Sequence, residues 1–265
     1  MRTTTHILSN NKTDFTTNFS SPIYLNQNKH YEAALLSIDL YNSIPNITDK
    51  NNKFKYSNDS GNTWKIITLN KGSYELQAIN DEIQRQMIIN DDYDSANNEF
   101  YITITANVSE LKSIVNIANA LYQVDFSVEN SIGSTLGFQP QVISHGYNKS
   151  QDIVDITKVN SVLVNVDIIS GSYVNGTQLP TKYSFNPNRV SPGYKIDERP
   201  NPTLIYFPIH RSTINCIRVW LTDQNMNLID LRGEEVTVKL CIREVVNIKQ
   251  QIKNAIKELK KENVL

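Results

Sequence analysis

The side chains best able to do chemistry, the histidines and cysteines, are dispersed along this sequence. None of the histidines is paired at i,i+4 with another metal-ligating residue; they are His6, His30, His145 and His210. The two cysteines, Cys216 and Cys241, have no neighbouring thiol. Protein zinc sites need three or four such ligands brought close together, usually at short spacings. The sequence therefore predicts no metal site and no cofactor.

Candidate catalytic groups are equally sparse. The run Gly133-Ser134-Thr135-Leu136-Gly137 resembles a nucleophile elbow, but its serine stands one place early and no alternation of strands and helices surrounds it. The glycines are better explained as shaping a short connection to Phe138. The acidic run 91–94 has enough oxygens for weak Ca²⁺ binding but lacks the EF-hand spacing, so a solvated loop is the favoured interpretation. We expect no enzyme.

Composition describes a folded protein with little overall charge. The 265 residues are 39% hydrophobic and 20% charged, with a formal net charge of −1. A protein that mainly neutralises nucleic-acid phosphates is usually strongly basic, so extensive nucleic-acid binding is disfavoured. No apolar run approaches the roughly 18 residues of a membrane-spanning helix, and the first residues lack the apolar core of a secretion signal. We expect no membrane insertion.

The elements that would position any site are mostly strands. Residues 100–105 and 236–243 alternate apolar and polar side chains, which is typical of half-buried strands. This alternation predicts an inward face made of Ile102, Ile104, Val236, Val238, Leu240 and Ile242. Further strands are predicted at 33–40, 64–69, 122–128, 159–169, 204–209 and 214–221. Strands without helices between them form antiparallel sheets, so the fold class is all-β.

Two helices interrupt this pattern. Residues 73–89 carry apolar side chains three and four apart, with Ser73 as a candidate N-cap. The second helix is predicted from about residue 245, and its apolar stripe is Ile248, Ile252, Ile256 and Leu259. Its lysines offer a weak contact with nucleic-acid phosphates, although a solvated helix face has the same composition.

These elements suggest three parts. Residues 1–30 are polar and predict an N-terminal arm, residues 31–244 predict one β-sandwich domain with an inserted helix, and residues 245–265 predict the C-terminal amphipathic helix. Within the domain, the Pro- and Asn-rich residues 171–202 predict a long loop on an assembly surface.

Several strings of ordinary residues carry a family resemblance. They are residues 18–25, 31–47, 51–56, 72–76, 136–138, 162–169 and 231–238. With these strings the chain resembles the penton (minor capsid) proteins of Polinton/Maverick elements and of adintovirus-like viruses, over most of its length.

The resemblance implies a single jelly-roll antiparallel β-sandwich and a structural role in a virion. The expected assembly is a homopentamer at the fivefold vertices of an icosahedral capsid, surrounded by a major, double jelly-roll capsid protein and built in the cytoplasm or nucleus of the host cell. It implies no catalytic residues. Separately from the resemblance, the position of the C-terminal helix after the last strand predicts that its apolar stripe, Ile248, Ile252, Ile256 and Leu259, contacts a neighbouring subunit or another capsid component. The alternative is that this helix folds back over an open end of its own sandwich.

Two alternatives belong to other classes. A carbohydrate- or receptor-binding β-sandwich module would give the same strand pattern, although it would usually carry a secretion signal or a dense cluster of aromatic residues. A hydrolase on a β scaffold would need an acid, a base or a nucleophile in a recognisable arrangement.

Overall fold

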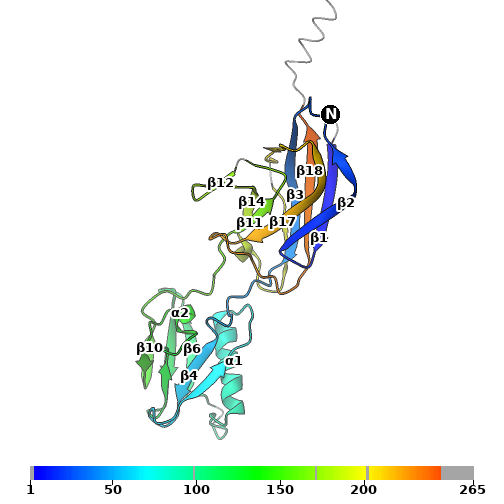
Figure 1. Ribbon diagram of the computed structural model, residues 1–265. Coiled ribbons are helices and arrows are strands. Elements are labelled where there is room, and N and C mark those ends of the chain that lie inside the picture. Colours follow the sequence, from blue (N-terminus) through cyan, green and yellow to red (C-terminus); the bar gives the residue numbers. More distant parts are fainter. Residues whose placement is uncertain (1–2, 98, 171, 201–202, 246–265) are drawn as a thin grey trace, which may run out of the picture. The chain divides into compact units, whose positions relative to one another are not determined.

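The computed structural model describes residues 3–97, 99–170, 172–200 and 203–245, and they form two compact units. Of the described residues, those within 3–42, 161–190 and 194–245 form unit 1, and those within 43–160 together with 191–193 form unit 2. Antiparallel strands dominate both units (Figure 1). Among the described residues, no helix has the length and apolar character needed to cross a membrane.

Unit 1 is a jelly roll. Its strands are β1 (Thr3–Asn10), β2 (Asp14–Tyr24), β3 (Tyr31–Tyr41), β11 (Val162–Val166), β12 (Ser172–Val174), β13 (Thr177–Leu179), β14 (Thr181–Phe185), β15 (Lys195–Glu198), β16 (Phe207–Pro208), β17 (Thr213–Thr222) and β18 (Val236–Glu244), with a 3₁₀ turn at Pro187–Arg189. One sheet has the order β1-β18-β3-β15 and the other the order β14-β11-β17-β2. Numbered among the eight sandwich strands, these orders are 1-8-3-6 and 5-4-7-2, which is the two-sheet jelly-roll arrangement.

Strand β18 contributes alternate side chains to the jelly-roll core, as its sequence pattern predicts. Val236, Val238 and Leu240 are all fully buried, and Ile242 is nearly so, which confirms the predicted inward face of this strand. Because side chains alternate across a strand, a slip of one residue would turn this apolar set toward water. The register with β3 shifts at Lys239/Leu240, where a bulge in β3 adds one residue.

Unit 2 is a second β-rich body inserted between the third and fourth jelly-roll strands. Its elements are β4 (Lys53–Ser57), β5 (Lys65–Thr68), α1 (Leu76–Ile89), β6 (Ile102–Asn107), β7 (Lys112–Ile117), β8 (Gln123–Asp125), α2 (Gly133–Leu136), β9 (Val142–Ile143) and β10 (Gly146–Lys149). A four-stranded sheet, β5-β4-β8-β9, and a three-stranded sheet, β10-β7-β6, share one core with α1. Ile102 and Ile104 are buried as predicted, but in this second core.

The structure draws the boundaries of the parts differently from the sequence prediction. Residues 1–30 contain the first two jelly-roll strands, and residues 31–244 are divided between two cores. The polar composition of β1 and β2 reflects their position: each is the outermost strand of its sheet, so one side meets no other strand. The predicted C-terminal helix at 245–265 lies outside the described residues, apart from Val245.

The long loop predicted at 171–202 is also different. It contains β14 and β15, two of the eight sandwich strands, and the hairpin β12–β13. Prolines mark the connections here rather than one continuous loop, because proline is excluded from central strands but suits strand ends and turns. The inserted helix begins at Leu76 rather than Ser73, whose hydroxyl donates to the carbonyl of Ile44 instead of capping.

Candidate assembly surface

Two long edge strands of the jelly roll lie on the same side of the sandwich. Among the described strands, β1 pairs only with β18, and β2 pairs only with β17, so each leaves one row of backbone groups without a strand partner. The turn at residues 11–13 joins the two strands, which belong to different sheets. We call β1 and β2 together the open side (Figure 1).

Charged residues, a common protection of a sheet edge, are nearly absent from the open side, and a proline, Pro22, and a bulge after Asn18 interrupt only the second half of β2. β1 contains no Asp, Glu, Lys or Arg, and β2 contains none after Asp14. Exposed apolar side chains occur on both strands: Ile7 is 64% exposed and Tyr24 is 76% exposed. Monomeric proteins blunt such edges with charges, prolines or bulges, because unpaired strand edges pair readily with other chains. An edge of this kind is suited to covering by a partner.

The far side of the sandwich is protected. Its edge strand β15 has the sequence Lys-Ile-Asp-Glu, and β16 ends in Pro208. Asp197 forms an ion pair with Arg199, with 2.8 Å between Oδ2 and Nη2. Arg199 also lowers the pKa of the Asp197 carboxyl, which keeps a negative charge on this edge. The two sides of one sandwich therefore differ in their ability to accept another chain.

A groove of about 440 Å³ lies at one end of the open side. Its lining is mainly apolar and consists of Thr4, His6, Pro22, Ile23, Tyr24, Leu25, Tyr31 and Ile242. The polar part is a pair in which Thr4 Oγ1 lies 3.0 Å from His6 Nε2. Partial burial lowers the pKa of His6, so its imidazole favours the neutral form, which can either donate or accept a hydrogen bond.

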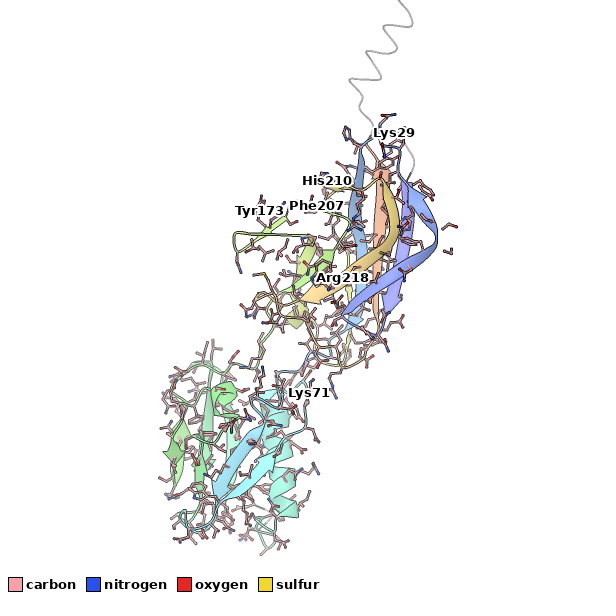
Figure 2. The ribbon with its side chains drawn as sticks, in the orientation of Figure 1. Lys29, Lys71, Tyr173, Phe207, His210 and Arg218 are labelled. Carbon is pink, nitrogen blue, oxygen red and sulfur yellow. The ribbon has the colours of Figure 1, made fainter. Side chains whose placement is uncertain are left out.

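A hairpin projects from the opposite edge of the sheet that contains β2. β12 and β13 form an isolated two-stranded ribbon closed by Asn175 and Gly176, both with positive φ (48° and 79°). Its eight residues carry no charge, and Tyr173 is 70% exposed (Figure 2). Its base is held to β14 by a hydrogen bond from the Ser172 hydroxyl to the Thr181 carbonyl oxygen.

The sequence-predicted contact residues Ile248, Ile252, Ile256 and Leu259 lie outside the described residues. The described chain reaches Val245, whose amide donates to the His30 carbonyl at 2.8 Å. The adjacent Glu244 pairs with Lys29 at 2.9 Å. This end of the chain is close in sequence to Ile242, which lines the groove.

The candidate nucleophile Ser134 and the acidic run that contains Asp92 both lie in unit 2. Within the described ranges, no three His, Cys, Asp or Glu side chains are grouped so that they could hold a metal ion. Ser134 lies in the short helix α2, which leads through Gly137 to the buried Phe138. Asp92, from the acidic run, is buried rather than solvated: it forms an ion pair with Lys65 and accepts a hydrogen bond from Tyr56. Burial and then this bond raise the pKa of the Tyr56 hydroxyl.

Sequence reasoning missed the open side and the hairpin. A signal for β2 was available, since Phe15, Thr17 and Phe19 alternate with the more exposed Thr16 and Asn18. The Asn175-Gly176 pair was the corresponding signal for the hairpin. Both signals were obscured by a local composition rich in Thr, Ser and Asn, which is also typical of loops.

Comparisons with known proteins find similarity among solved structures. No family model matches the sequence, and no curated protein matches it. Among solved structures, the crystal structure of the selenomethionine-labelled mavirus penton protein is similar to this chain with a TM-score of 0.47 and 11% sequence identity, over 92% of this chain and 99% of that chain. The jelly-roll assignment rests on the strand order of this chain.

Proposed function

We propose that this protein is a structural capsid protein, a penton that closes the fivefold vertices of an icosahedral virion as a homopentamer. The observation that carries the proposal is the open side: two long edge strands whose only Asp, Glu, Lys or Arg is Asp14, which is paired with Arg218. The fold alone does not select this function, because jelly rolls also serve as lectin and cupin domains. An edge suited to another chain favours assembly over ligand binding.

A ring follows from the two different sides of the sandwich. In a ring of identical subunits, one patch of each subunit contacts a different patch of the next, and the contact closes if the rotation does. The open side and the β14 edge, which carries the hairpin β12–β13, are two such patches on one domain. The proposed number of subunits, five, and the proposed partner, a double jelly-roll major capsid protein, both come from the sequence resemblance to Polinton/Maverick and adintovirus-like pentons. The proposed location is the virion, and the proposal includes no catalytic step and no cofactor.

The C-terminal segment has a separate part in this proposal. Its stripe of Ile248, Ile252, Ile256 and Leu259 docks onto a neighbouring subunit or another capsid component, while its lysines face solvent or packaged DNA. A chain truncated after Glu244 should then stay soluble with a nearly unchanged melting temperature and fail to join capsids. Aggregation or unfolding of the truncated chain would place the segment in the fold of its own subunit.

The experiment for the ring is the mass of the purified full chain in solution. A penton should give a species of about five times 30.2 kDa, the mass of one chain. Ile7→Lys places a charge on β1, where the side chain is already exposed, and should shift the mass toward the monomer without unfolding. Val142→Lys, at an exposed position of unit 2, is the matched control. A monomer that binds glycans on an array would instead support the carbohydrate-binding module.

A further inference from the structure

We infer that the hairpin β12–β13 of one subunit docks against the open side of the next, with Tyr173 inserted into the groove between β1 and β2. This inference rests on the proposed ring and names the contact that forms it. The occupant is a second copy of this chain, and the ligand is one aromatic side chain on a charge-free ribbon.

The first argument is position. In the sheet β14-β11-β17-β2, β14 and β2 are the two outer strands, and the hairpin extends from the β14 edge. Figure 1 shows β12 on the opposite side of the sandwich from β1 and β2. A subunit therefore cannot place its own hairpin on its own open side, whereas a head-to-tail neighbour can.

The second argument is charge. Residues 172–179 contain no ionisable group other than Tyr173. On the open side, β1 contains no Asp, Glu, Lys or Arg, and β2 contains none after Asp14. Burying these two surfaces against each other leaves no charge desolvated, which is the main cost of covering a polar edge. The far side, with Lys195, Asp197 and Arg199, would impose that cost.

The third argument is the fit of an aromatic side chain to the groove. Tyr173 is 70% exposed, on a two-stranded ribbon that would be marginal without further packing. Pro22, Ile23 and Ile242 provide apolar walls for a phenol ring, and the Thr4–His6 pair offers a hydrogen-bond partner for its hydroxyl. Tyrosine is enriched at interfaces because it combines these two kinds of contact.

Disulfide cross-linking tests the contact directly in the full chain. The double variant Tyr24→Cys/Tyr173→Cys, made with Cys216→Ser to remove the partly exposed native thiol, carries one thiol on each patch. Three strand spacings separate β2 from β14, roughly 14 Å, so the two thiols cannot meet within one chain. Mild oxidation should give reducible covalent oligomers up to the pentamer. Tyr24→Cys/Tyr147→Cys, which uses an even more exposed tyrosine of unit 2, should give none.

Affinity provides a second measurement. Tyr173→Ala should weaken association about tenfold or more, as expected for an aromatic anchor, and Tyr173→Phe should restore most of it. Tyr147→Ala is the control and should leave association unchanged. If the parent is pentameric but the Tyr24/Tyr173 pair does not cross-link, the docking inference is wrong and the ring stands. If the parent is a monomer and no cross-link forms, both are wrong.

Discussion

At the scale of single residues, Gly137 is a position where both the backbone conformation and a close neighbour disfavour any side chain. Its φ of +82° lies in the left-handed region, and a Cβ atom there would overlap the carbonyl oxygen of Asp152. That carbonyl belongs to a segment hydrogen-bonded to this turn, because the Asp152 amide donates to the Gly137 carbonyl at 2.9 Å. The turn that ends α2 is thus fixed by the absence of a side chain.

Gly137→Ala should therefore lower the free energy of unfolding by more than its left-handed conformation alone explains. Gly233→Ala is the matched control, since Gly233 has a φ of +83° with nothing within 4 Å of its added Cβ. The control should cost about 1 kcal/mol, the usual penalty for this conformation, and Gly137→Ala clearly more. Denaturant unfolding of both variants measures the difference. Equal losses would show that the Asp152 carbonyl moves aside freely.

Lys182 is a buried lysine between the two sheets of the jelly roll. Its side chain comes from β14, donates to the Ala33 carbonyl of β3, and places Nζ 4.2 Å from the Phe207 ring centroid. Only 4% of the residue is exposed. Burial lowers the pKa of Lys182 to about 7, and the Glu32 charge opposes part of this shift.

This pKa makes stability depend on pH in a defined direction. Between about pH 7 and 10.5 the unfolded chain holds a proton on Lys182 that the folded chain has released. Because the unfolded state then binds more protons, folding stability rises as pH increases through this window. Relative to Lys182→Met, the parent should gain up to about 1.4 kcal/mol per pH unit there. Urea unfolding at several pH values measures this gain, and parallel curves for the two proteins would contradict it.

At the scale of elements, strong alternation was predictable and edge position was not. Strands β3, β17 and β18 were found from sequence because each buries one apolar face, as Ile38, Ile217 and Val238 do. β1 and β2 were missed because an outer strand can be polar along its free edge and still pair on the other side. The hairpin was missed because its residues are mostly polar and none of them is fully buried, so no apolar periodicity marks it.

The division into two cores was also hidden from the sequence. Ile104 and Val238 have the same burial and the same local pattern, yet they belong to different units. Periodicity reports that a face is buried, but which elements share a core depends on contacts between distant segments. As for the candidate site, the sequence indicated assembly through the family resemblance, while the open side and its groove required the strand order.

Within the former loop region, the hairpin and the strand β14 should respond differently to deletion. Replacing residues 173–178 by a Gly-Gly turn removes an exposed ribbon and should leave the melting temperature almost unchanged. Replacing residues 181–185 removes a sandwich strand that contains the buried Thr181 and Phe185, and should unfold unit 1. Circular dichroism during heating distinguishes them. A hairpin deletion that abolishes folding would show that the ribbon supports its own subunit.

At the scale of the whole molecule, the chain combines a jelly roll that has the open side with an inserted unit that has its own core. The inserted unit joins between β3 and β11, so it lengthens one connection of the sandwich without changing the order of its eight strands. Insertions at such connections are tolerated because closing a longer loop costs little. The open side is thus a property of unit 1 alone.

The central claim is that the open side is covered when the protein assembles, and residue-resolved hydrogen exchange of the purified full chain tests it most directly. In the assembled protein, amides of β1 and β2 that point away from β18 and β17 should exchange as slowly as those of the central strands. Ile7→Lys should make the same amides exchange rapidly while leaving β3 protected. Rapid exchange of these outward amides in the parent protein, at concentrations where it is assembled, would contradict the account.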